Sequence, residues 1–455
     1  MSLPRYAEYK ASGVEWLGKI PKHWVSKRLK QIYHVYPSNV DKKSYDEEQA
    51  VRLCNYTDVY YNDVISAGIE FMSATASADQ IARFELHAGD TLITKDSETA
   101  DDIAISAYVP KSMPGVVCGY HLAVVRPRER VVGAFIKRLF DSSYLCARFE
   151  VLANGLTRVG LSQYALDNVD VPVPPPTEQI AIAGFLDRET GKIDALVAEQ
   201  EKLIALLKEK RQAVISHAVT KGLNPDAPMT PSGIEWLGDV PAHWEVKALK
   251  FVARVQTGIA KGKDNEDRNV VSVPYLRVAN VQDGYFDLTE VAMIEIAAYA
   301  LPRYLLRSGD VLMNEGGDFD KLGRGHVWQG EIDPCIHQNH VFAVRPVAIP
   351  SEWLNLVTGS DYAQFYFMTR SKQSTNLASI SSTNLMELPM LIPPEIERNA
   401  IIEFMEAESS CLDVLNAEAN RTITLLKERR SALISAAVTG QIDVRGLVPQ
   451  QAEAA

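Results

Sequence analysis

The chain is a tandem duplication, and this feature constrains its architecture more than any other. The segment Ser12–Lys30 returns as Ser232–Lys250 with 12 of 19 positions identical, at an offset of 220 residues. A second segment, Leu206–Thr220, returns as Leu425–Thr439 with 11 of 15 positions identical, at an offset of 219. Repetition at a fixed period indicates copies of one structural unit. We therefore expect two similar halves of about 220 residues each.

Shorter echoes keep the same offset. A Gly-Asp-x-Leu turn at Gly89 recurs at Gly309, and a Val-Arg-Pro run at Val125 recurs at Val344. Chance does not hold one offset over so many segments, so the duplication extends through the regions where the two copies have diverged.

Composition excludes several classes of protein. No stretch of the 455 residues approaches the roughly 18 uncharged apolar residues that a membrane span needs, and the polar first residues contain no secretory apolar region. Five cysteines without framework spacing fit a reducing compartment. We therefore expect a cytoplasmic protein that contacts no membrane. The net charge of −11 argues mildly against a protein that binds DNA phosphates on its own.

Each half changes character once along the chain. Short β-branched runs with Gly and Pro, typical of strands and turns, are followed by a Pro-rich stop and a long helical pattern. Thr177 is the expected N-cap of the first long helix, and Gly222 stands just past its end. The expected fold is mixed α/β, with domains at 1–173 and 223–392, long helices at 174–222 and 393–442, and a flexible tail at 443–455.

Apolar residues in both helical regions alternate at spacings of three and four, the pattern of a coiled-coil seam. About 43 residues at 1.5 Å each make a helix of roughly 65 Å. A helix of this length needs a partner, and the other copy is the natural one. The predicted seam consists of Ile182, Leu186, Ile193, Leu196, Leu203, Leu207 and Val214 in the first helix, and Ile401, Met405, Leu412, Leu415, Leu426 and Leu433 in the second.

No set of residues matches a catalytic site. The nearest approach to a phosphate-binding loop, at Gly258–Asp264, has the wrong spacing and lacks a hydroxyl after the lysine. The Pro-Pro pairs before the helices lack the aromatic residue expected of an amino-methyltransferase loop. We therefore expect no catalytic residues in this chain.

Two groups of histidines are better explained by packing than by chemistry. Cys335, His337 and His340 have a metal-like density, but no fourth ligand for a structural zinc site is evident. The pairs His23-Trp24 and His243-Trp244 lie in the best-repeated segment, where a histidine beside a tryptophan is typical of packing. We expect no metal site.

The two halves diverge in their polar loops, while the helices and the Trp-rich segment hardly differ. Lys95–Glu98 stands against Glu315–Asp318, and Asn154–Arg158 stands against Gln373–Leu377. A repeated scaffold with varied loops is the pattern expected of two sites that read two different targets.

The repeated segments resemble those of the specificity (S) subunit of type I restriction–modification enzymes. The similarity rests on SGxEWLG followed by Pro and His-Trp, on the Gly-Asp-x-Leu turn, and on the helix that follows Pro-Pro, and it covers essentially the whole chain. It implies two α/β target recognition domains joined by two long helices that pack as an antiparallel coiled coil. One departure is that Glu397-Arg398 replaces Glu178-Gln179 in the second copy, so the contacts at the two helix starts are expected to differ.

The resemblance implies a non-catalytic subunit that reads double-stranded DNA. Each domain would read one part of a bipartite sequence, and the coiled coil would set the gap between the parts. Its partners would be two methyltransferase subunits, which use S-adenosylmethionine, and restriction/motor subunits, which use ATP and Mg²⁺, with no cofactor bound by this chain. Partner subunits would supply much of the phosphate contact, which reconciles DNA binding with the acidic charge. The alternative is that the acidic patches dock the partner subunits.

Candidate base-reading residues are those in the variable polar loops whose side chains suit base edges. Arginine and lysine pair naturally with guanine, and asparagine and glutamine pair with adenine. For each of them, a solvated surface residue is the competing explanation. The candidates are Lys95, Asn154, Thr157 and Arg158 in the first half, and Lys321, Arg324, Gln338, Asn376 and Ser379 in the second.

Two other functions stay open from the sequence. One is a nuclease or methyltransferase with a degenerate site, which a metal ion or S-adenosylmethionine bound to the lone chain would support. The other is a non-catalytic scaffold that bridges proteins without DNA, which two protected patches on DNA about one helical turn apart would reject.

Overall fold

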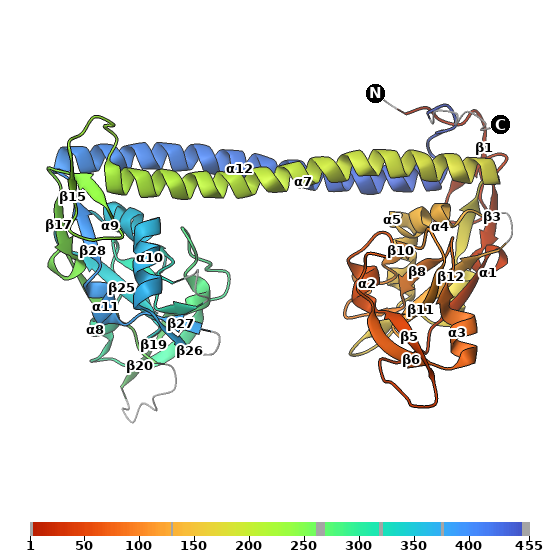
Figure 1. Ribbon diagram of the computed structural model, residues 1–455, viewed down its shortest axis with the longest axis horizontal. Coiled ribbons are helices and arrows are strands. Elements are labelled where there is room, and N and C mark those ends of the chain that lie inside the picture. The colour runs from red at the N-terminus through yellow and green to blue at the C-terminus, as the bar shows by residue number, and fades with distance from the viewer. Residues whose placement is uncertain (1–2, 129–130, 261–268, 318–321, 375–376, 448–455) are drawn as a thin grey trace. The chain divides into compact units, whose positions relative to one another are not determined.

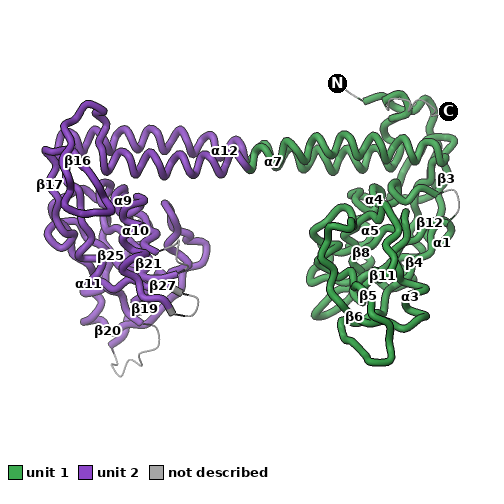
Figure 2. The backbone as a smooth tube through the Cα atoms, viewed as in Figure 1, with its two compact units in different colours: residues 1–201, 420–455 green, residues 202–419 purple. Residues whose placement is uncertain are grey.

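The structure is a computed structural model that describes residues 3–128, 131–260, 269–317, 322–374 and 377–447. The chain divides into two compact units, shown in Figure 2: unit 1 comprises residues 1–201 and 420–455, and unit 2 comprises residues 202–419. Each unit therefore holds one globular repeat together with one end of each long helix.

Unit 1 is built on two four-stranded sheets. Their strands are β4 (Tyr33–Pro37), β5 (Gln49–Cys54), β6 (Met72–Ala76), β7 (Glu85–Leu86), β8 (Thr91–Thr94), β10 (Ser106–Tyr108), β11 (Met113–Cys118) and β12 (Leu122–Pro127). One sheet has the antiparallel order β10-β8-β12-β4, and the other has the order β6-β5-β11-β7 with β5 and β11 parallel. Figure 1 labels β5, β6, β8, β10, β11 and β12 of these sheets. Because side chains alternate along a strand, Leu92 of β8 enters one core and Ile93 enters the other.

Short helices and strand pairs complete unit 1. The helices are α1 (Leu29–Ile32), α2 (Tyr56–Tyr60), α3 (Ala78–Phe84), α4 (Gly133–Phe140), α5 (Ser143–Leu152) and α6 (Gln163–Asn168). The strand pairs are β1 (Tyr9–Ala11) with β2 (Lys19–Pro21), β3 (Val25–Arg28) with β14 (Asp170–Val173), and β9 (Asp96–Ser97) with β13 (Val159–Gly160).

Unit 2 repeats this plan. Its main strands are β18 (Ala253–Thr257), β19 (Val270–Leu276), β20 (Ala292–Ala297), β21 (Val311–Asn314), β23 (Gly325–Val327), β24 (Ile336–His337) and β25 (Val341–Pro346). The antiparallel order β18-β25-β21-β23 corresponds strand for strand to β4-β12-β8-β10, and the sheet β20-β19-β24 keeps the parallel pair in β19 and β24. The duplication inferred from the sequence is therefore present in the topology.

The remaining elements of unit 2 follow those of unit 1. The helices are α8 (Leu301–Tyr304), α9 (Ser351–Thr358), α10 (Asp361–Arg370) and α11 (Ser382–Met386). The short strands are β15 (Met229–Pro231), β16 (Asp239–Pro241), β17 (Glu245–Ala248), β22 (Gly316–Gly317), β26 (Lys372–Ser374), β27 (Leu377–Ser379) and β28 (Pro389–Ile392).

A buried ion pair explains the repeated Gly-Asp turn and Val-Arg-Pro run. Arg126 donates from Nε and Nη2 to the two oxygens of the fully buried Asp90, at 2.9 and 2.7 Å, and Arg345 donates likewise to Asp310, both at 2.6 Å. The glycine before each aspartate has a φ of +91° or +89°, a conformation that other residues adopt only with strain. The two echoes are therefore halves of one structural contact.

The two long helices run antiparallel within each unit. They are α7 (Pro176–Lys221) and α12 (Glu395–Val438), about 69 and 66 Å long at 1.5 Å per residue. In unit 1 the start of α7 shares a core with the end of α12, through Ile182 and Ile434. In unit 2 the end of α7 shares a core with the start of α12, through Val219 and Ile401. The mixed α/β fold with an antiparallel coiled coil is confirmed.

The start of α7 lies two residues before the start implied by Thr177 as N-cap. The helix begins at Pro176, so Thr177 lies inside its first turn and is not the N-cap. The amides of Glu178 and Gln179 both donate to the carbonyl of Pro175, at 2.9 and 3.0 Å. Proline suits the first helical position because its ring presets the backbone and its missing N–H would have no partner there.

The helix seam also differs from the predicted residues. Leu196, Leu203 and Leu415 are 51%, 40% and 47% exposed, whereas Val197 and Ile204 are less exposed than their leucine neighbours. A straight α-helix has 3.6 residues per turn, so its inward face drifts from a strict 3.5-residue repeat. At positions 196 and 203 of α7 the strict alternation therefore selects the wrong neighbour, whereas at Leu415 the preceding Val414 is more exposed still, at 66%.

Polar pairs hold the helices together at matching places in the two units. In unit 1, Arg430 of α12 donates from Nε to Asp194 of α7 at 2.9 Å. In unit 2, the counterpart Arg211 of α7 pairs with Asp413 of α12. Both contacts follow from the repeat, because the two arginines are counterparts and so are the two aspartates. The arginine lies on α12 in unit 1 and on α7 in unit 2.

The residues after α12 return to unit 1. The amide of Asp443 donates to the carbonyl of Pro4 at 2.8 Å, and Val444 is fully buried in the unit 1 core. The predicted flexible tail starts at 443, and its last part, 448–455, lies outside the described residues.

Candidate nucleic-acid interface

In unit 1 a polar loop follows α5 and pairs with β9, the short strand after β8. This loop, hairpin 1 (residues 154–160), is closed by two backbone hydrogen bonds between Asn154 and Gly160, at 3.1 and 2.9 Å. Its last residues form β13, which pairs with β9 so that Gly160 faces Asp96. Residues 154–158 are all exposed. Hairpin 1 therefore presents the predicted residues Asn154, Thr157 and Arg158 on a fixed base.

Lys95 lies at that base, and it is not a free surface cation. Its Nζ donates to the carbonyl of Ser38 at 3.0 Å and stands 4.4 Å from the centre of the Tyr120 ring. Burial lowers the pKa of Lys95 from its ordinary value, although the charge of Asp96 acts in the opposite direction. Its backbone carbonyl accepts from Leu161 at 2.8 Å, so Lys95 supports hairpin 1.

A histidine and a carboxylate complete the base of hairpin 1. His121 Nδ1 lies 2.9 and 3.1 Å from the two oxygens of Asp96. His121 also borders a small cavity of about 70 Å³, which is lined by Asp41, Lys42, Asn55, Tyr56, Gly119, Tyr120 and His121. The surface around hairpin 1 thus offers hydrogen-bond donors, acceptors and aromatic rings together.

Unit 2 carries a different hairpin at the corresponding place. Hairpin 2 (residues 372–379) consists of β26 and β27, and β27 pairs with β22 so that Ser379 faces Gly316. The exposed Ser379 is therefore the counterpart of Gly160 at the base of hairpin 1. Beside it, His340 Nδ1 lies 2.8 Å from Glu315 Oε2.

The other predicted residues of unit 2 lie around this base. Gln338 begins the turn that leads to His340, and its Oε1 accepts from the amide of Val278 at 3.3 Å. Arg324 is partly exposed, and its carbonyl accepts from the amide of Asn314, the residue before Glu315. Lys321 and Asn376 lie outside the described residues.

The two histidine–carboxylate pairs are the functional candidates that sequence reasoning missed. The available signal was the recurrence of a histidine at 121 and 340, an offset of 219 that matches the repeat. In the structure His340 pairs with Glu315, while His337 is fully buried and its Nδ1 lies 2.7 Å from the carbonyl of Val341. Within the described ranges no three His, Cys, Asp or Glu side chains come together as metal ligands.

The His-Trp pairs pack at the helix starts, and the two copies differ there as expected. Glu178 accepts from Trp24 Nε1 at 2.9 Å and from the Tyr6 hydroxyl at 3.1 Å, and lies 2.6 Å from His23 Nε2. Burial, and then the charge of Glu178, raise the pKa of Tyr6 above its ordinary range. In unit 2, Glu397 lies 2.6 Å from His243 Nε2, but Trp244 Nε1 has no partner among the described residues.

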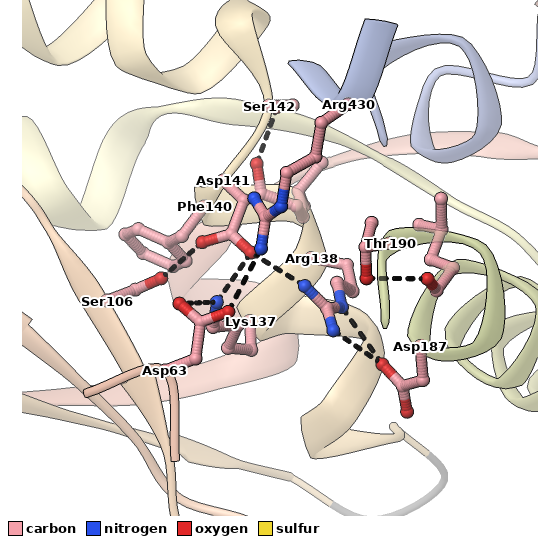
Figure 3. Close-up of polar contacts among 12 residues, drawn as sticks. Asp63, Ser106, Lys137, Arg138, Phe140, Asp141, Ser142, Asp187, Thr190 and Arg430 are labelled. Carbon is pink, nitrogen blue, oxygen red and sulfur yellow. Dashed lines mark hydrogen bonds and ion pairs between the residues drawn. The ribbon is translucent and has the colours of Figure 1, made fainter. Parts of the chain in front are cut away.

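A charged network fixes the globular part of unit 1 to its helices (Figure 3). Lys137 of α4, only 4% exposed, lies 2.7 Å from Asp141 and 3.0 Å from Asp63. Arg430 of α12 contacts the same Asp63 at 3.0 Å, and Arg138 reaches Asp187 of α7 at 2.8 Å. In unit 1 these contacts fix the orientation of the base of hairpin 1 relative to the helix pair.

None of the described helices is long and apolar enough to cross a membrane.

Comparison with known proteins places this geometry in context. A family model described as type I restriction modification DNA specificity domain matches residues 21–205. The specificity subunit of the type I restriction enzyme EcoKI from Escherichia coli K12 is 24% identical over 339 residues, which cover 72% of this chain and 68% of that protein. These similarities confirm the resemblance found in the repeated segments.

Solved structures share the fold. A chain from a structure of a type I R-M system superposes with a TM-score of 0.68 at 16% identity, over 92% of this chain and 98% of that one. The HsdS subunit of Thermoanaerobacter tengcongensis superposes with a TM-score of 0.51 at 17% identity, over the same shares of the two chains.

Proposed function

We propose that this chain, which belongs to the family of type I restriction–modification specificity subunits, reads a bipartite DNA sequence with one unit on each half. The observation that carries the proposal is the contrast between scaffold and hairpins. The sheets, the buried Asp–Arg pairs and the helix contacts recur in both units. Hairpin 1 and hairpin 2 lie at corresponding places and differ in the length of their strands. Among the residues whose exposure is described, no exposed residue type of hairpin 1 recurs among the exposed residues of hairpin 2.

The chemistry of hairpin 1 suits base reading in a DNA groove. Arg158 is exposed and has the fork of donors that matches the acceptors of guanine, and Asn154 has the paired donor and acceptor that match adenine. Asn154 is partly committed, because its Nδ2 donates to the carbonyl of Leu152 at 2.8 Å. Arg158 is therefore the stronger candidate in unit 1, and Arg324, Gln338 and Ser379 are the described candidates in unit 2.

We propose that α7 and α12 set the gap between the two half-targets. A pair of helices about 65 to 70 Å long by their rise per residue is a stiff spacer, because each buries apolar and ionic contacts against the other in both units. A stiff spacer fixes how many base pairs separate two reading sites.

Partner subunits would supply the chemistry. We propose that two methyltransferase subunits using S-adenosylmethionine, and restriction/motor subunits using ATP and Mg²⁺, assemble on this chain in the cytoplasm, and that the chain itself holds none of these cofactors. The net charge of −11 supports this division, since an acidic chain gains little from DNA phosphates alone. We expect weak DNA binding by the isolated chain and strong binding by the assembly.

A footprint on DNA tests the proposal. The complex with the methyltransferase subunit should protect two patches on target DNA with a fixed unprotected gap, and the isolated chain should protect them only weakly. A single patch would contradict reading by two units. Assembly without any protected DNA would favour a protein scaffold instead.

A further inference from the structure

Each unit holds an imidazole oriented by a carboxylate at the base of its hairpin. His121 Nδ1 lies 2.9 Å from Asp96 Oδ1, and His340 Nδ1 lies 2.8 Å from Glu315 Oε2. The carbonyls of the two histidines accept from the amides of Lys95 and Glu315, at 3.0 and 2.9 Å. The two histidines therefore occupy the same place in the repeated fold.

The two units hold this imidazole with different residues. Asp96 of β9 pairs with β13, and Gly316 of β22 pairs with β27, so Asp96 and Gly316 are counterparts. Lys95 and Glu315, the residues before them, are counterparts as well. The carboxylate thus comes from a position one residue earlier in unit 2. What the two units share is the oriented imidazole next to a hairpin whose exposed residues differ.

The second ring nitrogen, Nε2, is the atom that would face a ligand. With both nitrogens protonated, Nδ1–H donates to the carboxylate and Nε2–H donates to an anionic oxygen, as a charge-assisted hydrogen bond. The side chain of His121 is 34% exposed and borders the cavity with Lys42 and Tyr120, and that of His340 is 58% exposed. In unit 2 the amide of Asn339 already contacts this nitrogen, because Asn339 Nδ2 lies 3.3 Å from His340 Nε2. A phosphate oxygen that binds His340 Nε2–H would replace this contact, with the Asn339 amide beside it as a second donor.

We propose that the Asp96–His121 and Glu315–His340 pairs each bind a phosphate of the DNA backbone. The inference rests on the proposed DNA-reading function and assigns it a sequence-independent contact. Phosphates position a protein on DNA, and base edges specify the sequence. A group shared by two units that read different half-targets must contact what those half-targets share, which is the phosphate backbone.

Salt dependence of DNA binding tests this assignment. His121→Ala, His340→Ala and the double variant, each assembled with the methyltransferase subunit, are titrated with a target duplex and a scrambled duplex between 50 and 200 mM salt. Each single change should weaken binding to both duplexes by the same factor. It should also reduce the slope of log K against log salt by about 0.9, so that affinity falls about 3.5-fold less over this range. The double variant should lose twice that slope.

Matched variants separate contact from folding. His87 provides the control, because it lies 3.9 Å from Glu85 at the opposite end of β8 and is similarly exposed, so His87→Ala should leave the slope unchanged. His121→Gln keeps a neutral donor and should recover part of the affinity but not the slope. A change of slope in His121→Gln together with normal methylation specificity would exclude a collapsed hairpin as the cause.

Several results would overturn the assignment. A loss confined to the target duplex, or a changed methylation sequence, would make the histidines base readers. An unchanged slope in His121→Ala, in His340→Ala and in the double variant would show that the pairs do not contact phosphate. If the wild-type complex fails to distinguish target from scrambled DNA, the proposed function itself fails, and that result is separate from the slope.

Discussion

At the scale of single residues, the buried Asp–Arg pair is the most strongly held contact of each globular repeat. Asp90 has no exposed surface, and both of its oxygens accept from Arg126, while one also accepts from the amide of His87 at 2.8 Å. A buried carboxylate that loses its only charged partner keeps the full cost of its desolvation. The pair therefore fixes β8 against β12 at the end of β8 that lies away from hairpin 1.

Removing the arginine should destabilise unit 1 locally. We expect Arg126→Met to cost about 3 to 5 kcal/mol, because Asp90 would stay buried and unpaired. Hydrogen exchange in β8 and β12 should accelerate, and exchange in β21 and β25 of unit 2 should not. Lys22→Met is the control, since Lys22 forms an exposed pair with Glu8 that is worth about 0 to 1 kcal/mol. Equal exchange in both variants would refute the assigned role of the pair.

Arg158 carries the sharpest prediction about sequence reading. It is exposed on hairpin 1 and has no assigned structural role there. Arg158→Ala should weaken binding to the target by about 1 to 3 kcal/mol and relax one position in one half of the methylated sequence. Lys22→Ala, on the exposed surface of the same unit, should change neither. A loss of affinity that is equal for target and scrambled DNA would mean that Arg158 contacts phosphate instead of a base.

At the scale of elements, the two globular repeats attach to the helices by different means. Lys137 and Asp141 form the charged network of unit 1, whereas Asn355 and Gly359 occupy the matching positions of unit 2, as the hydrogen bonds around Ser142 and Ser360 show. Ion pairs weaken with acid and salt, while apolar packing does not. Acid should therefore loosen unit 1 before unit 2.

The lowered pKa of Asp63 gives the direction of this pH dependence of stability. Burial acts to raise its pKa, but the charges of Lys137, Arg430 and Arg138 outweigh burial and hold the pKa below its ordinary value. A carboxyl whose pKa is depressed in the folded state stabilises the protein above its unfolded pKa, near 3.9, and loses that contribution as pH falls through the folded pKa. Asp63 is 55% exposed, so the contribution is modest, about 1 kcal/mol or less.

The test is a comparison of unfolding at two acidities. Asp63→Asn should lower the urea midpoint of unit 1 at pH 7, and the difference from wild type should vanish below about pH 3. Asp101→Asn, on an exposed turn of the same unit, is the control. A difference that persists unchanged at low pH would mean that the Asp63 charge is not its source.

The elements also show where sequence reasoning succeeds and where it fails. The long helices end where glycine stops them, and Gly222 follows α7 with a φ of +75°. The seam residues Leu196 and Leu203 were predicted wrongly, because spacing alone does not track the drift of a 3.6-residue helix. The histidine–carboxylate pairs escaped detection because Asp96 and Glu315 do not align, so comparison of the copies at one offset separates them.

At the scale of the whole molecule, the duplication made the fold predictable but did not reveal which DNA sequence the chain would recognise. Two copies of one segment dictate two similar units, since each must bury the same apolar pattern. The exposed residues of hairpin 1 and hairpin 2 bury nothing, so no packing constraint reveals what they contact. Under the proposed function their role depends on DNA, which neither the pattern nor the fold of the chain encodes.

The spacer role of the helices makes a geometric prediction. Inserting four residues inside Glu199–Lys210 adds about one helical turn, 5 to 6 Å, which is close to two base pairs at 3.4 Å each. The gap in the recognised sequence should lengthen while both half-sites stay the same, most clearly when α12 receives a matching insertion. Deleting four residues should shorten the gap. An unchanged gap in active variants would refute the spacer role.

The most direct measurement is a map of methylated adenines in host DNA, obtained by long-read sequencing of cells that express the chain with the proposed methyltransferase partner. We predict a two-part sequence with a fixed gap, which disappears when this chain is deleted and the methyltransferase is kept. The same methylation in the absence of the chain, with an active methyltransferase present, would contradict the proposal that the chain selects the DNA sequence.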